Sequence, residues 1–126
     1  MTHARLRSAR RSRRASTSRL SLERRDGYWL WVGGPVPPGY SGITIWSLIS
    51  IRRGVADDSH LLRHELEHVR QWHEHGPIGF LRRYLGSYLG LRLAGYGHGA
   101  AYRRIPFEIE AERAAVDSER NLESNS

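Results

Sequence analysis

The sequence contains no cysteine and no lysine. Because cysteine is absent, disulfides and thiolate metal sites are excluded, and any transition-metal site must be built from histidine, aspartate and glutamate. The absence does not indicate a compartment, since a chain without cysteine folds equally well in reducing and oxidising surroundings. All twenty basic residues are arginine. We interpret this as the codon bias of a GC-rich genome, because no site chemistry needs arginine at every one of these positions.

Long apolar runs are also absent. The second helical pattern, residues 78–93, is too short to span a membrane and is interrupted by Arg82, Arg83 and Arg92. The N-terminal segment lacks the apolar region that a secretory signal requires, and we therefore expect a cytoplasmic protein. At 126 residues, of which 39% are hydrophobic, the chain predicts a single domain with a core of modest size.

The formal net charge of +7 is concentrated in an N-terminal arm, residues 1–25. This arm has nine arginines and a single acid, Glu23, whereas residues 26–126 have eleven arginines and twelve acids. The arm is rich in arginine and serine and poor in apolar residues, so it predicts disorder. Its clustered arginines would bind phosphates without sequence preference, which makes nucleic acid or an anionic surface a candidate partner through residues 1–25 alone. A solvated arm without a function and an organelle-targeting peptide are the alternatives.

Residues 26–120 predict a single α+β domain, and residues 121–126 predict a polar tail. The expected elements, in chain order, are a strand at 28–34, a loop at 35–42, a strand or tight hairpin at 43–51, helices at 58–75 and 78–93, a glycine-rich loop at 94–100, and a third helix from about Pro106. Asp57, Asp58 and Ser59 are all good N-caps for the first helix, and Gly76 with Pro77 ends it.

Aromatic residues of these elements are expected to fill the core. Trp29, Trp31 and Trp46 fall in the predicted strand segments, where burial is favoured over a role in binding. Tyr84 and Tyr88 fall on the apolar face of the second helix. We therefore expect all five to be packing residues.

The first helix contains the motif His64-Glu65-Leu66-Glu67-His68, which matches H-E-x-x-H. Residues four apart in a helix differ by about 40° around the axis and by about 6 Å along it, so both imidazoles project from one face. That spacing lets both coordinate a single Zn²⁺ at roughly 2.0–2.1 Å. Glu65 would lie beside the metal rather than on it, where it can hold and deprotonate a metal-bound water. Glu67 is expected to be an ordinary surface residue.

Two histidines leave such a site incomplete, because a catalytic zinc site uses three protein ligands and one water. His75 lies about 10 Å beyond His68 along the helix axis, too far to share the ion. His73 points away from His68 and is expected to be exposed. A metzincin site would need glycine at position 71 and histidine at position 74, but the sequence has Gln71 and Glu74, which excludes that class.

The remaining candidate lies in the last helix, where Glu108 and Glu112 are four residues apart and share a face. Together with H-E-x-x-H, this pair resembles the E-x-x-x-D arrangement of the gluzincins, the thermolysin-like zinc peptidases. The resemblance implies that Glu108 is the third metal ligand. It also implies that Glu112, which stands where the family has aspartate, accepts a hydrogen bond from a ligating histidine. Glu110 would face away from Glu108.

The resemblance covers residues 43–115, and in size the chain is similar to the single-domain minimal gluzincins, some of which are latent. It implies a zincin-like fold in which a small sheet packs on an active-site helix and two further helices. It also implies a zinc-dependent peptidase with one Zn²⁺, a peptide or protein substrate, and Glu65 as the general base. Tyr96, His98 and Tyr102 precede the glutamate helix and are candidate hydrogen-bond donors to the oxyanion formed during hydrolysis.

Two other interpretations stay open. A fourth ligand from within the chain or from a partner would make the zinc structural, and His98 or His60 are the candidates within the chain. Alternatively, the chain is a nucleic-acid-binding module that acts through its basic arm. Residues 26–126, in which acids outnumber arginines by one, offer no basic surface that the sequence identifies.

Overall fold

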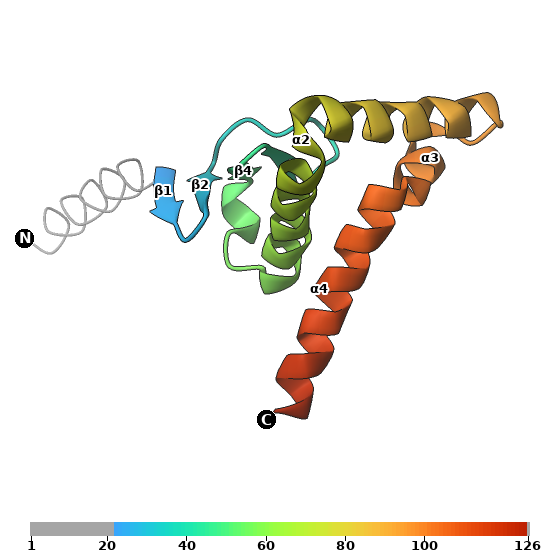
Figure 1. Ribbon diagram of the computed structural model, residues 1–126. Helices are drawn as coiled ribbons and strands as arrows, with labels where there is room; N and C mark the ends of the chain where they lie inside the picture. The colour runs from blue at the N-terminus through green and yellow to red at the C-terminus, as the bar shows by residue number, and fades with distance from the viewer. Residues whose placement is uncertain (1–21, 126) are drawn as a thin grey trace, which may run out of the picture.

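A computed structural model describes residues 22–125, and its first part is a four-stranded mixed sheet (Figure 1). The strands are β1 (Leu22–Arg25), β2 (Tyr28–Val32), β3 (Gly42–Ile45) and β4 (Leu48–Ile51), and their order in the sheet is β1-β2-β4-β3. β1 forms an antiparallel pair with β2, β3 forms another with β4, and β2 runs parallel to β4. The stretch 43–51 is therefore a tight hairpin, one of its two predicted forms, and β3 is an edge strand next to α2.

The helices are α2 (Ser59–Leu93), α3 (His98–Arg104) and α4 (Pro106–Ser124), and a short 3-10 turn, η1 (Arg53–Val55), precedes them. α2 starts where the sequence predicts, because the Asp58 carboxylate accepts a hydrogen bond from Leu61 N–H at 3.1 Å. Two segments of α2 meet at a kink at Gly76, whose φ of 73° lies in the left-handed region that glycine tolerates. The predicted break between two helices is thus present at the predicted position.

Two apolar cores hold the elements together. The first segment of α2 has the sheet on one side and α4 on the other (Figure 1). The core on the sheet side consists of Tyr28, Leu30, Ile49, Ile51 and Val69. The core at the corner of α2, α3 and α4 consists of Trp72, Phe80, Ile105 and Phe107. Between them, α2 and α4 bury the polar side chains of His68, Gln71 and Glu108.

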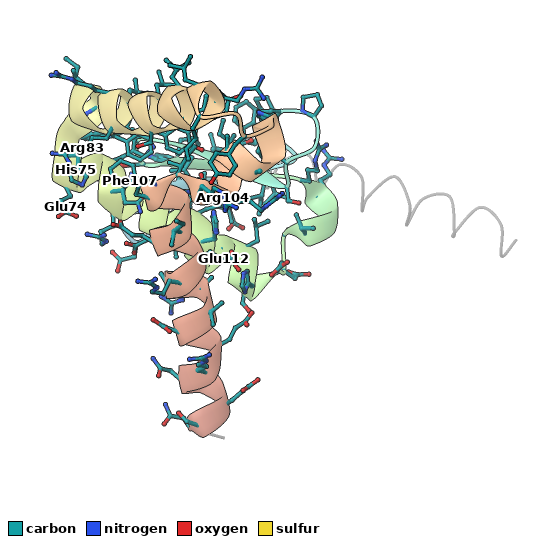
Figure 2. The ribbon with its side chains drawn as sticks, turned by 90° about the vertical axis from the view of Figure 1, so that its right-hand side faces the viewer. Glu74, His75, Arg83, Arg104, Phe107 and Glu112 are labelled. Carbon is teal, nitrogen blue, oxygen red and sulfur yellow. The ribbon has the colours of Figure 1, made fainter. Side chains whose placement is uncertain are left out.

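Three segments differ from their prediction. Leu22–Arg25 were assigned to the arm but form β1, because their backbone pairs with β2 although most of their side chains are exposed. The glycine-rich loop is shorter than expected, since α3 starts at His98. The polar tail continues α4 as far as Ser124, and both views show these last turns extending beyond the other elements (Figures 1 and 2). Residues 1–21 lie outside the described residues, so the predicted disorder and phosphate binding of the arm stay predictions.

The fold is α+β, as the sequence predicts. Within residues 22–125, no helix has both the length and the apolar character needed to cross a membrane. The expectation that the strand tryptophans are buried is wrong for Trp29 and Trp46, each 40% exposed. Trp29 alternates with the buried Tyr28 and Leu30 and so lies on the open face of the sheet, and Trp46 lies in the β3–β4 turn rather than in a strand.

Candidate metal centre

The contact between α2 and α4 brings three potential metal ligands together. Ala111 and Ala115 are fully buried in this contact, and their small side chains let the two helices approach closely. His64 and His68 on α2 therefore face Glu108 in the first turn of α4. One ligand atom from each of the three lies within 4.8 Å of the others, and no further histidine or carboxylate within residues 22–125 joins this group.

Glu108 lies between the two imidazoles. Its Oε2 is 2.9 Å from His64 Nε2, and its Oε1 is 3.1 Å from His68 Nε2. Glu108 and His68 are buried, and His64 is partly buried. A carboxylate oxygen cannot donate, so each contact needs either a hydrogen on the ring nitrogen or a metal cation between the partners.

Each histidine is held by another partner at its second ring nitrogen. His64 Nδ1 lies 3.2 Å from Oε2 of Glu112, whose side chain projects from α4 (Figure 2). His68 Nδ1 lies 2.8 Å from Gln71 Oε1. The Gln71 amide nitrogen donates to the Phe107 carbonyl at 3.0 Å, so its oxygen is left to accept from His68. Both histidines therefore carry hydrogen on Nδ1 and direct Nε2 toward the shared carboxylate, the arrangement that ligation through Nε2 requires.

The charges of the three groups depend on one another. Burial would raise the pKa of Glu108, but hydrogen bonds from His64 and His68 hold it well below the usual range. Burial would lower the pKa of His64 and His68, but the hydrogen bonds and the charge of Glu108 outweigh that effect and raise both. Without a metal the three side chains form a compact ion-pair cluster, in which a divalent cation would replace the protons.

Glu65 is buried at the wall of the same site and does not belong to the ligand group. Thr44 of β3 donates from Oγ1 to Glu65 Oε2 at 2.6 Å. A Cβ at Gly42 would come within 3.2 Å of Glu65 Oε1, so the edge strand also approaches the second oxygen closely. The carboxylate is therefore held in a defined orientation by β3.

A cavity of about 650 Å³ adjoins the cluster and is bounded by β3, α2 and α3. Glu65, His68 and Glu108 line it. Most of its other lining residues are apolar or aromatic, among them Ile43, Ile45, Trp72, Phe80, Leu81 and Leu85. A concave, largely apolar space with a few convergent polar groups is the usual form of a ligand-binding site.

Two of the four tyrosines that line this cavity, Tyr84 and Tyr102, lie close to Glu108. Tyr84 Oη donates to Glu108 Oε1 at 2.8 Å, and Tyr102 also lines the cavity. Burial and the nearby charge of Glu108 raise the pKa of both tyrosines, so both stay protonated and able to donate at neutral pH. The prediction that Tyr84 is a packing residue is therefore incomplete, because its ring packs while its hydroxyl contacts the site.

The other two candidate oxyanion donors have different surroundings. His98 lines the cavity, and its Nε2 and Nδ1 lie 2.7 Å and 2.9 Å from the hydroxyl groups of Tyr40 and Tyr88. Tyr96 does not line the cavity; it is exposed, and the Arg104 guanidinium lies 4.5 Å from the centre of its ring. The structure thus brings His98 to the cavity but not Tyr96.

Other histidines and acids near the motif point elsewhere. His60 contacts two carboxylates of α4, at 2.7 Å and 2.8 Å, outside the ligand group. His73 is exposed, as predicted. His75 packs against the ring of Phe107 at 5.1 Å (Figure 2), and Glu110 accepts from Gln71 at 3.1 Å. None of these residues supplies a further ligand atom to the cluster.

The sequence does not predict a site role for three residues that contact the site: Thr44, Gln71 and Tyr84. Gln71 could have been found, because it follows His68 by three residues and therefore shares its helix face. Thr44 comes from β3 and Tyr84 from the part of α2 beyond the kink, so no local signal places them beside Glu65 and Glu108.

We expect Glu112→Ala to weaken the binding of a divalent cation to this cluster about 10- to 100-fold, because loss of an outer hydrogen-bond partner would leave His64 free to rotate. Glu112→Gln should restore most of the affinity, since the amide oxygen can still accept from His64 Nδ1. Glu119→Ala is the matched control, because Glu119 contacts His60 but is not a partner of His64. Competition with a chromophoric chelator measures the affinity. Equal affinity for Glu112→Ala and the parent would show that this contact does not orient His64.

Comparison of the chain with protein-family models, with curated proteins and with solved structures finds no match. The resemblance to the gluzincins therefore rests on the motif residues of the sequence. A functional conclusion has to come from the geometry of the site and from the chemistry of its side chains.

Proposed function

We propose that this chain is a zinc-dependent hydrolase of the gluzincin type that cleaves peptide bonds. The observation that carries the proposal is the ligand group of His64, His68 and Glu108, with Glu65 beside it at the wall of one cavity. Three protein ligands and an open fourth position are the arrangement of catalytic zinc sites. The placement of the H-E-x-x-H helix between a small sheet and the glutamate helix supports a zincin-like architecture.

The side chains fit Zn²⁺ by their chemistry. Two imidazole nitrogens and a carboxylate oxygen are ligands that zinc accepts, and Glu112 and Gln71 hold the second nitrogen of each imidazole. Neither His60 nor His98, the candidates for a fourth ligand, belongs to the group. This favours a catalytic over a structural ion. A bound zinc would lower the pKa of water to about 7 and polarise a carbonyl.

The protein's own groups have distinct tasks in this proposal. Glu65 takes the proton of the attacking water and returns it to the leaving amine, and Thr44 keeps the carboxylate oriented for both transfers. Tyr102 carries a protonated hydroxyl that can donate to the oxyanion developing on the scissile carbonyl, whereas the single hydroxyl hydrogen of Tyr84 is donated to Glu108. The apolar walls of the cavity would accept an apolar side chain of a peptide or protein substrate.

Two measurements on the purified full chain test the proposal. Metal analysis after dialysis against zinc should find one zinc per chain, and a hydroxamate should bind the holoprotein, because hydroxamates need an open coordination position. Absence of stoichiometric zinc would refute the proposal that the chain is a zinc-dependent hydrolase. Zinc without hydroxamate binding would favour the rival in which a fourth ligand makes the ion structural.

Thr44→Val should reduce kcat about tenfold or more while leaving zinc content unchanged. The substitution keeps the shape of the side chain and removes a hydrogen bond to an ionised group, which contributes roughly 1.5–3 kcal/mol. Thr44→Ser restores a hydroxyl and is the matched rescue. Steady-state hydrolysis of a quenched fluorescent peptide measures the effect. A Thr44→Val enzyme with unchanged kcat would show that Glu65 does not depend on this contact.

A further inference from the structure

The region from the kink of α2 to the start of α4 differs in charge from the rest of the domain. We name residues 76–107 the basic segment, because they contain five arginines and no aspartate or glutamate. Residues 108–125, by contrast, contain six acids and two arginines. Among the residues that the structure describes, no carboxylate forms an ion pair with an arginine of the basic segment. Their charge is therefore available to an external partner.

The second segment of α2 runs along the top of the molecule in Figure 1. It exposes an aliphatic face. We name this face the aliphatic stripe, and it consists of Ile78, Leu81, Leu85, Leu89 and Leu93. These positions recur at intervals of three or four residues and so line one side of a helix. The exposed fraction reaches 82% at Ile78 and 90% at Leu93, so the described part of the chain does not cover the ends of the stripe.

Arginines and aromatic residues border the stripe. Arg82 and Arg92 lie at neighbouring helical positions, where their apolar stems can follow the stripe while the guanidinium groups reach outward. Beyond the end of the helix, exposed Tyr96 packs under Arg104 at 4.5 Å. An aliphatic face bordered by arginine and tyrosine is typical of helices that lie in the headgroup region of a membrane.

We propose that the aliphatic stripe and the basic segment dock on an anionic lipid surface, with the second segment of α2 lying flat in the headgroup region. Charge complementarity decides among the occupants, since Arg82 and Arg92 lie beside the stripe and the basic segment contains no acid, which matches a surface of anionic headgroups. A second copy docked stripe to stripe would bring two such segments together, and their like charges would repel. The helix is too short in apolar length to span a bilayer, which is consistent with a surface position.

This docking would place the membrane next to the candidate metal centre. Leu81 and Leu85 belong to the stripe and also line the cavity that contains His68 and Glu108. The lipid contact itself needs neither metal nor hydrolysis, so its test is independent of the proposed function.

The absence of cysteine allows a single label to test the docking in the full chain. Leu89→Cys and, as the matched control on α4, Asn121→Cys each receive an environment-sensitive nitrobenzoxadiazole dye. The variants are mixed with vesicles of equal parts phosphatidylglycerol and phosphatidylcholine, and with vesicles of phosphatidylcholine alone. On anionic vesicles, emission from position 89 should shift to the blue and be quenched by brominated lipid, whereas emission from position 121 should stay unchanged.

The basic arm could also bind anionic vesicles, so the measurement is repeated in a full chain whose seven arginines before residue 22 are replaced by glutamine. The blue shift at position 89 should persist in that chain. Loss of the shift there would assign lipid binding to the arm, and absence of the shift in the parent would show that the stripe does not enter the lipid; either result would overturn the proposal. A blue shift that grows with protein concentration without vesicles would overturn it too, in favour of a second copy.

The contribution of the arginines is measured in the same arm-neutralised chain. Arg82→Gln and Arg92→Gln combined should raise the lipid concentration at half-maximal blue shift on the order of 25-fold, since each arginine near an anionic surface contributes roughly fivefold. Arg113→Gln with Arg120→Gln, both on α4, is the matched control and should change it little. Equal effects of the two sets would overturn docking through the basic segment.

Discussion

Glu65→Gln is expected to abolish peptide hydrolysis while leaving zinc bound. General-base catalysis contributes about 10²- to 10⁴-fold, so kcat should fall by at least about 100-fold. The substitution keeps the size of the side chain, and its amide oxygen can still accept from Thr44 Oγ1, so the wall of the cavity should stay intact. Peptide hydrolysis and bound zinc, both measured on one preparation, separate loss of the base from loss of the metal.

Glu67→Gln is the matched control for this experiment. Glu67 lies two residues further along the same helix and pairs with Arg70 rather than with the metal cluster. Glu67 is partly buried, with 18% of its side chain exposed, rather than the ordinary surface residue that the sequence predicts. Its replacement should still leave both zinc content and hydrolysis near the parent values, because its partner Arg70 is exposed and neither residue contacts the cluster. Retained hydrolysis in Glu65→Gln would refute the assignment of Glu65 as general base, whatever the metal content.

The helices could be predicted from sequence because their boundaries depend on local chemistry. Asp58 caps α2 through its own side chain, Gly76 supplies the left-handed conformation at the kink, and Pro106 occupies the first turn of α4. Each of these signals acts within a few residues. α3 has no such signal, since no side chain caps its first turn and glycines surround its start.

The sheet was harder to predict because its pairing is not local. The residues of β1 are mostly charged and exposed, and only their backbone pairing with β2 orders them. The burial of the strand tryptophans was mispredicted for the same reason. A period of two identifies alternate faces of β2, but it does not say which face the helices will cover.

The part of the site that could be predicted from sequence is the group of His64, Glu65 and His68. These residues lie within about one helical turn, so helix geometry alone places them close together. Glu108 needs the tertiary contact between α2 and α4, and only the resemblance to a family placed it there. Thr44 and Tyr84 contact the site from a strand and from the far side of the kink. Such residues are defined by the packing of whole elements, which a single sequence does not specify.

The assignment of the third ligand is tested by Glu108→Gln, which should lose both zinc and hydrolysis. The substitution removes the charge that faces both imidazoles, so it should cost more affinity than the roughly 10- to 100-fold expected for an outer partner. The pattern differs from that of Glu65→Gln, in which hydrolysis is lost and zinc is kept. Zinc affinity by chelator competition and a circular dichroism spectrum, which reports folding, are measured on each variant.

Glu110→Gln provides the control for position and charge, because Glu110 lies two residues away in α4 and is half exposed. Glu110 accepts a hydrogen bond from Gln71 but contacts none of the three ligand residues, so zinc affinity should change little. Parent-like zinc binding in a folded Glu108→Gln variant would mean that the ion is held elsewhere. It would remove Glu108 as a ligand and with it the gluzincin resemblance, because the two histidines alone do not distinguish that class from a chance motif.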